Sequence, residues 1–152
     1  KLDDAIFQFI DTGKPFIGIC LGLQLLFEKS EEFGETNGLG IVKGEVKKFQ
    51  LDYNKSIKYP VPQIGWNKIT KNKTSWEDSL FCNNKNNDFM YFVHSYYVKP
   101  EDPSIILSTT KYGNIEYCSS IKQNNIIAFQ FHPEKSGVVG LNIYKTLKKE
   151  FC

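Results

Sequence analysis

The residue of this sequence that is best suited to chemistry is a cysteine between two glycines. Cys20 follows an apolar segment that reads as the end of a buried strand, and apolar residues recur at helical spacing over 21–30. A strand that turns sharply into a helix presents the side chain at the turn, and Gly18 and Gly22 tolerate the close approach that such a turn needs. The positive end of the helix favours the nucleophilic thiolate, and the N–H of Leu21 is placed to donate to an oxyanion. The alternative is a buried cysteine packed between two glycines.

A thiol nucleophile needs a base, and the chain has two histidines, His94 and His132. His132 follows an apolar run that predicts a strand, and the active sites of α/β proteins gather at the carboxyl ends of strands. Pro133 ends the strand pairing, and Glu134 lies within reach of the imidazole, where it can fix the tautomer. The alternative for His132 is a surface histidine at a strand end. His94 lies inside a long apolar run, and we interpret it as a structural histidine.

The two segments together resemble the class I, triad-type glutamine amidotransferases. The resemblance is carried by Gly-Ile-Cys-Leu-Gly-Leu-Gln around Cys20 and by Phe-His-Pro-Glu-Lys-Ser around His132. In that family the domain hydrolyses glutamine to glutamate and ammonia through a cysteinyl thioester, and the ammonia passes to a partner. The resemblance implies Cys20 as nucleophile, His132 as general base and acid, and Glu134 as the group that orients it. It also implies that Gln24 contacts the substrate amide and that no cofactor is needed.

Further segments are similar to the glutaminase subunits of imidazole glycerol phosphate synthase, an enzyme of histidine biosynthesis. They are the segments 25–32, 38–40, 64–67 and 91–96. In that family the acidic residue that matches Glu32 holds the α-amino group of glutamine, and backbone at Ser95 and Tyr96 binds its carboxylate. The segment with Trp66 and Asn67 meets the synthase subunit, a (β/α)8 barrel that receives ammonia and closes the imidazole ring.

Each of these implied roles has a simpler alternative. Gln24 and Glu32 could be ordinary polar residues on a helix and a loop, and Trp66 could belong to the core. Gln63 stands where the family often has histidine, which leaves open a paralogue that feeds another acceptor, such as an enzyme that amidinates a surface sugar. A third reading is an inactive fragment that acts as a binding or scaffold module.

The family also carries an oxyanion segment and the first βα units of its sheet before the nucleophile, and no such segment precedes Lys1 in this sequence. We therefore expect residues 1–152 to be one amidotransferase domain without its N-terminal part. The expected fold is α/β, with a flavodoxin-like mixed sheet flanked by helices, as in class I amidotransferases.

Composition excludes several other classes of protein. The chain has 152 residues and a formal net charge of +2, which gives no electrostatic case for nucleic-acid binding. No apolar run approaches the roughly 20 residues that span a bilayer. The four cysteines fit no zinc pattern, and the chain is not a small disulfide scaffold, so we expect no metal site and reduced thiols in a cytoplasm.

Hydrophobic periodicity predicts the elements that position these residues. The predicted helices cover 1–11, 21–30, 74–80 and 140–151, and the predicted strands cover 14–19, 41–49, 61–69, 89–98, 105–110, 115–122 and 126–131. Residues 123–125 are predicted to join the last two strands as a hairpin. In the last helix we expect Leu141, Tyr144 and Leu147 to form the buried stripe.

Overall fold

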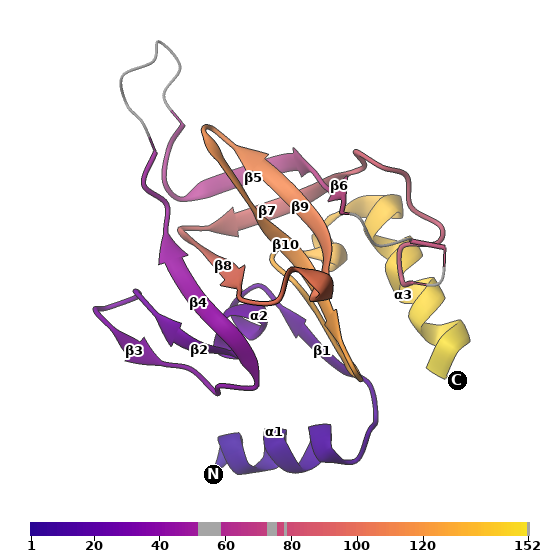
Figure 1. The fold of residues 1–152 in the computed structure, drawn as a ribbon. Coiled ribbons are helices and arrows are strands. Elements are labelled where there is room, and N and C mark those ends of the chain that lie inside the picture. Colours follow the sequence, from indigo (N-terminus) through magenta and orange to yellow (C-terminus); the bar gives the residue numbers. More distant parts are fainter. Residues whose placement is uncertain (52–58, 73–75, 78, 152) are drawn as a thin grey trace.

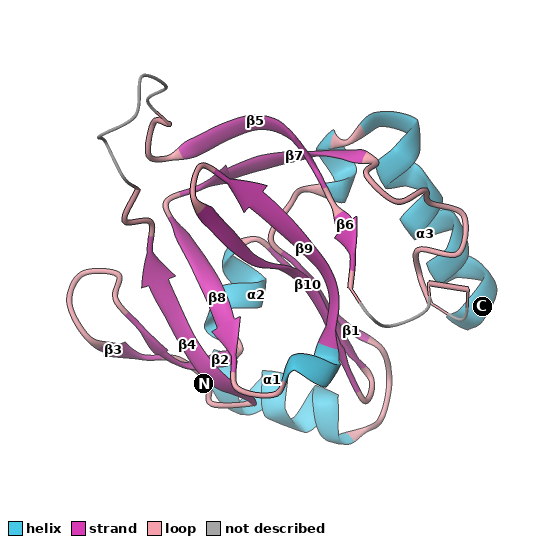
Figure 2. Ribbon diagram, turned by 45° about the horizontal axis from the view of Figure 1, so that its top comes forward, coloured by secondary structure: helices cyan, strands magenta, loops and turns pink. Residues whose placement is uncertain are grey.

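The computed structural model describes residues 1–51, 59–72, 76–77 and 79–151, and its strands form a curled mixed sheet with a two-stranded ribbon beside it (Figures 1 and 2). In chain order the elements are α1 (Leu2–Asp11), β1 (Phe16–Ile19), α2 (Leu21–Leu25), β2 (Phe27–Ser30), β3 (Thr36–Asn37), β4 (Val42–Lys48), β5 (Gln63–Lys68), β6 (Thr70–Lys71), β7 (Phe89–His94), β8 (Tyr96–Pro100), η1 (Pro103–Ile105), β9 (Ile106–Tyr112), β10 (Ile115–Gln123), β11 (Ile126–Phe129), η2 (Pro133–Lys135) and α3 (Gly137–Phe151). Residues 52–58 and part of the predicted helix over 74–80 lie outside the described residues, and the described residues of that segment, 76–77 and 79–80, form turns and no helix.

The main sheet has the strand order β1-β11-β10-β8-β4-β2-β3, and β9 pairs with both β10 and β6. Strand β1 runs parallel to β11, whereas β10 and β11 form an antiparallel hairpin, as predicted. Strands β5 and β7 form the separate ribbon. The sheet therefore mixes both pairing directions, which confirms the expected fold class.

The predicted strand over 89–98 is two strands, because its two halves pair with different partners. Strand β7 pairs with β5 in the ribbon, whereas β8 pairs with β4 in the main sheet. The change of partner falls at Ser95, whose carbonyl accepts a hydrogen bond from the N–H of Phe49 at 3.1 Å. The chain is thus bent between the two sheets at the residues that the family resemblance marks for substrate binding.

The prediction of one helix over 21–30 is wrong. Helix α2 ends at Leu25, and Phe27 begins strand β2, which pairs in parallel with β4. The carbonyl of Leu26 accepts hydrogen bonds from the N–H groups of Ile41 and Val42, both at 2.9 Å, so long-range pairing has replaced helical bonding there. The Phe27 side chain is fully buried, and its apolar character fits either structure.

Helix α3 begins at Gly137, earlier than predicted, and its buried stripe differs from the predicted one. Leu141 is half exposed, whereas Ile143 is fully buried and Leu147 is buried as expected. Gly140 faces the turn η2 so closely that a Cβ there would lie 2.0 Å from the carbonyl oxygen of Pro133. The first turn of α3 therefore fixes the position of the segment that carries His132.

We predict that Gly140→Ala destabilises the chain by about 1–3 kcal/mol, because the added methyl group must displace backbone. For a chain of this size that corresponds to a fall in Tm of several degrees, roughly 2–4 °C per kcal/mol. The matched control is Val138→Ala in the same turn, which removes an exposed side chain. Equal Tm values for the two variants in thermal denaturation would contradict the close approach.

Candidate active site

The parallel pairing of β1 with β11 positions the cysteine. The N–H of Cys20 donates to the carbonyl of Phe129 at 2.7 Å, which continues the pairing one residue past the end of β1. Cys20 has φ 51° and ψ −102°, a backbone conformation that non-glycine residues rarely adopt. A Cβ at Gly18 would lie 2.9 Å from the backbone of Gly22, so only glycine fits there. The sharp turn expected around the cysteine is present.

His132 stands at the end of the neighbouring strand. It follows β11, and its N–H donates to the carbonyl of Tyr91 in β7 at 2.9 Å. The Ser136 hydroxyl ties the same two segments together, because it donates to the His132 carbonyl at 2.6 Å and accepts from the Tyr91 N–H at 3.0 Å. Because β1 and β11 are parallel neighbours, Cys20 and His132 lie at the same edge of the sheet.

The His132 ring is oriented by the predicted carboxylate. Its Nδ1 lies 2.6 Å from Oε1 of Glu134, and since a carboxylate accepts, the Nδ1–H donates. Its Nε2 is buried and has no hydrogen-bond partner among the described residues. In this tautomer the Nε2 lone pair can take up a proton. The ring is therefore arranged as a base.

The surroundings of the thiol raise the pKa of Cys20 above its ordinary value. Burial is the main cause, and the carboxylate charges of Glu134 and Glu32 act in the same direction. The Leu21 N–H and the Gln130 amide lower the pKa but do not outweigh burial. The N–H at the start of α2 therefore favours the thiolate, but burial outweighs it and the net pKa is raised. The nucleophile needs a base to ionise it.

Two contacts of the sulfur were not anticipated from the sequence. Sγ of Cys20 lies 3.7 Å from the carbonyl oxygen of Val93, to which the thiol can donate, and 3.8 Å from Nε2 of Gln130. The available signal for Gln130 was one polar residue inside an otherwise apolar run. No sequence signal distinguished Val93, because only its backbone is involved.

Gln24 lies beside the thiol on the following helix. Its Nε2 donates to the Tyr96 carbonyl at 2.9 Å and to Oε1 of Gln130 at 3.2 Å, which uses both amide hydrogens. The carbonyl oxygen of the Gln24 side chain is thus the group left for a substrate donor. Its predicted role as a substrate contact is compatible with this geometry and stays a prediction, as do the roles of Glu32, Ser95 and Tyr96.

His94 differs from His132 in every respect that matters for proton transfer. It is buried, its Nδ1 lies 2.7 Å from the Tyr96 carbonyl, and its Nε2 lies 3.2 Å from the Tyr117 hydroxyl. Burial lowers the pKa of His94 to about 4, so the ring is neutral near pH 7. It serves as a fixed link in a buried network, in agreement with the structural interpretation.

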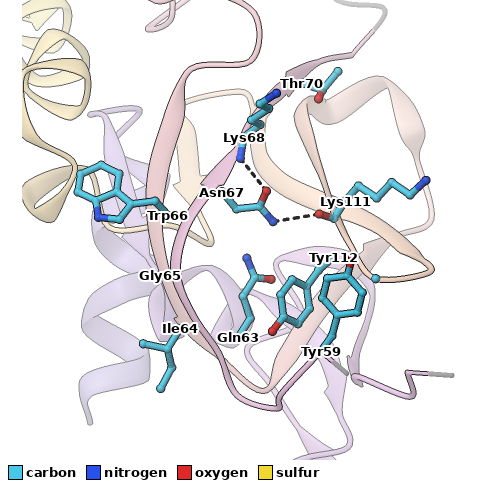
Figure 3. A pocket seen from close by; sticks show the side chains of 11 residues that line it. Tyr59, Gln63, Ile64, Gly65, Trp66, Asn67, Lys68, Thr70, Lys111 and Tyr112 are labelled. Atoms are coloured by element: carbon cyan, nitrogen blue, oxygen red, sulfur yellow. Dashed lines mark hydrogen bonds between the residues drawn. The ribbon is translucent and has the colours of Figure 1, made fainter. Parts of the chain in front are cut away.

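The residues expected at the partner interface lie on the ribbon strand β5, where they point in opposite directions (Figure 3). Trp66 and Ile64 are exposed on one face, at 55% and 62%. Asn67 faces the β9–β10 hairpin and donates to the Lys111 carbonyl at 2.9 Å. On that side, with Gln63, it lines a pocket of about 470 Å³ that does not include the cysteine.

Other features of the described residues bear on the expected chemistry. Cys20, Cys82 and Cys118 are free thiols. In the part of the chain that the structure describes, no group of three or more His, Cys, Asp or Glu side chains could hold a metal ion. No helix in that part is long and apolar enough to cross a membrane.

Comparison with known proteins identifies the family. Residues 2–145 match the family described as glutamine amidotransferase class-I. The chain belongs to the class I glutamine amidotransferases. This amidotransferase is 49% identical over 150 residues to imidazole glycerol phosphate synthase subunit HisH of Aquifex aeolicus, covering 99% of this chain and 68% of the relative. It is 47% identical over 148 residues to the subunit of the same name from Pyrococcus furiosus, covering 97% of this chain and 71% of the relative. The chain thus spans about two thirds of the length of these relatives.

Solved structures share the fold of this amidotransferase. The structure of PurLQS from Thermotoga maritima superposes with a TM-score of 0.70 at 18% identity, covering 100% of this chain and 69% of that one. A glutamine amidotransferase from the same organism gives a TM-score of 0.56 at 16% identity, covering 97% of this chain and 52% of that one. At such identities the likeness shows the fold alone, and it agrees with the predicted fold class.

We predict that Glu32→Gln lowers the pKa of Cys20, because it removes a carboxylate whose charge opposes ionisation of the thiol. Alkylation of Cys20 by iodoacetamide at pH 7.5, followed by peptide mass spectrometry, should become about two-fold to several-fold faster. The matched control is Glu31→Gln. Its carboxylate bonds Lys47 and Lys48 instead, so the rate should not change. A rate for Glu32→Gln at or below that of the unmodified chain would contradict the arrangement.

Proposed function

We propose that this chain carries the glutaminase function of imidazole glycerol phosphate synthase. It hydrolyses glutamine and supplies ammonia to the synthase subunit that closes the imidazole ring in histidine biosynthesis. Membership of the class I amidotransferases and 42–49% identity to subunits named HisH support this assignment. The single structural observation that carries it is the His132 ring. Its Nδ1 is held by Glu134, and its buried Nε2, which has no hydrogen-bond partner in the described part of the chain, lies at the sheet edge that bears Cys20.

The proposed reaction has two halves, each with a proton transfer at one nitrogen. Nε2 of His132 takes the thiol proton as Sγ of Cys20 attacks the carboxamide carbon of glutamine, and the C–N bond breaks as that proton passes to the leaving nitrogen. Ammonia leaves and a thioester remains. The same nitrogen then takes a proton from water, whose oxygen attacks the thioester, and returns it to the sulfur as glutamate forms. Glu134 stabilises the imidazolium in both halves.

The groups around the thiol suggest how glutamine is held. Glu32 accepts the α-ammonium group, the backbone at Ser95 and Tyr96 binds the α-carboxylate, and Gln24 accepts a hydrogen bond through its side-chain oxygen. The Leu21 N–H donates to the developing oxyanion, since it already acts on the sulfur. An ammonium group beside Glu32 offsets the charge that raises the pKa of the thiol, so substrate binding itself favours ionisation of the nucleophile.

For the partner we propose a (β/α)8 barrel that docks against the exposed face of the β5–β7 ribbon. Ile64 and Trp66 from β5 and Phe89 from β7 are each about half or more exposed, which is unusual for large apolar side chains on neighbouring strands. Trp66 and Tyr91 pack edge to face with ring centroids 6.0 Å apart, which gives this face a rigid centre. Asn67 supports β5 from the opposite side. We place the complex in the cytoplasm, where the nucleophilic thiol stays reduced.

A second candidate is a paralogous glutaminase that feeds a different ammonia acceptor. It is favoured by one feature only, Gln63, which stands where the family often has histidine. The two candidates share the site chemistry and differ in the partner that stimulates it. The experiment below therefore includes the phosphoribosyl substrate of the histidine pathway.

We predict that a diazoketone analogue of glutamine modifies Cys20 when the chain is bound to a histidine-pathway synthase subunit. Glutamate release should be stimulated by that subunit and its phosphoribosyl substrate, and Cys20→Ala should abolish both readouts. Cys82→Ala, which changes an exposed cysteine, is the matched control and should retain both. Labelling without stimulation would favour the paralogue. An unmodified Cys20 in the complex would contradict the proposed function.

A further inference from the structure

Gln130 lies in the active site, and neither the proposed reaction nor the proposed mode of substrate binding uses it. Its side chain is fully buried directly after strand β11, and its N–H donates to the Ser119 carbonyl at 2.9 Å. Burying a side-chain amide is costly unless its polar atoms are hydrogen-bonded. Both polar atoms of this amide have partners, and both partners belong to the site.

The orientation of the Gln130 amide follows from the Tyr96 carbonyl, to which it is linked by two successive hydrogen bonds through the Gln24 amide. The Tyr96 carbonyl can only accept, so the nearest atom of the Gln24 amide must be its nitrogen. The remaining hydrogen of that nitrogen points to Gln130, which must present its oxygen, at 3.2 Å. The Gln130 nitrogen is then left to face the sulfur of Cys20, at 3.8 Å.

The Tyr96 carbonyl is itself held in place. It accepts from Nδ1 of His94 at 2.7 Å as well as from Gln24, which uses both of its lone pairs. The ring of His94 is buried and fixed at its other nitrogen by Tyr117. A rigid chain of hydrogen bonds therefore runs from the core to the nucleophile, and its direction cannot be reversed at Gln130.

We propose that Gln130 is a positioning residue for the nucleophile. Its amide nitrogen holds the sulfur of Cys20 and donates to the thiolate once the proton has gone, while its oxygen orients the Gln24 amide toward the substrate. The thiol proton in the resting state points to the Val93 carbonyl, so the sulfur lies between a donor and an acceptor. When the thiol loses its proton, the Gln130 amide can still donate to the sulfur, whereas the hydrogen bond to the Val93 carbonyl is lost.

A contribution of Gln130 to catalysis rests on the proposed function. The hydrogen bond from its amide nitrogen to the sulfur of Cys20 does not, and it can be tested without glutamine. Gln130→Glu keeps an oxygen for Gln24 and replaces the donor by a carboxylate that repels a thiolate. Gln130→Met removes the donor at nearly the same size without adding charge. Gln123→Glu, at the surface end of β10, is the matched control for the charge.

The measurement is the pH profile of Cys20 alkylation by iodoacetamide in the folded chain, followed by peptide mass spectrometry, with the exposed Cys82 as internal reference. Gln130→Glu should move the midpoint for Cys20 upward by about one pH unit or more and slow alkylation at pH 7.5 about ten-fold. Gln130→Met should raise the midpoint of the Cys20 profile by a smaller amount, and Gln123→Glu should leave this midpoint unchanged.

A merely structural role for Gln130 would lower Tm and leave the midpoint of the Cys20 profile where it is. If Gln130→Glu does not fold, Gln130→Met decides, and a folded Gln130→Met with an unchanged midpoint overturns the proposal. The predicted shifts in the two Gln130 variants, together with an absence of glutaminase activity in the unmodified chain bound to its partner, would instead count against the proposed function and leave the role of Gln130 intact.

Discussion

The pairing of β1 with β11 is the interaction on which the rest of the site depends. Two parallel neighbours end at the same sheet edge, so the residue after one strand and the residues after the other necessarily meet. The bond from the Cys20 N–H to the Phe129 carbonyl, at 2.7 Å, extends that pairing to the nucleophile itself. The positive φ of Cys20 then turns the chain into α2 and presents the thiol at the edge.

The second constraint is that the apolar run over 89–98 is divided between the ribbon and the main sheet. Because β7 pairs with β5 and β8 with β4, the chain bends at Ser95, and the carbonyl groups of Val93 and Tyr96 come to lie beside the nucleophile and Gln24. A straight strand would direct these carbonyls into its own sheet. The bend also connects the site to the exposed face of β5, so a partner bound there would contact the same ribbon that supports His132 through Tyr91.

Sequence reasoning predicted the parts of the candidate site that depend on local chemistry. A thiol between glycines and a histidine followed two residues later by a carboxylate are patterns whose geometry is set by few bonds. Strands β1 and β11, which flank these residues, were also predicted, although each is shorter than expected. The roles of Gln24 and Glu32 come from the family resemblance alone and stay predictions.

What sequence reasoning missed depends on tertiary pairing. Nothing in Phe27 distinguishes a helix from a strand, and only the pairing of β2 with β4 decides between them. The apolar residues of α3 allow more than one buried stripe, and only packing against the core, which buries Ile143 and Leu147, decides against Leu141. No role was predicted for Gln130, because its contacts in the site depend on the Tyr96 carbonyl, which is distant in the sequence.

The most direct measurement of the central claim is a crystal structure of the Cys20→Ala chain, bound to its synthase subunit, with intact glutamine in the site. The account predicts the carboxamide carbon above residue 20, the α-ammonium group at Glu32, and Nε2 of His132 within about 3.5 Å of the amide nitrogen. Glutamine bound elsewhere, or a His132 ring turned away from it, would contradict the account.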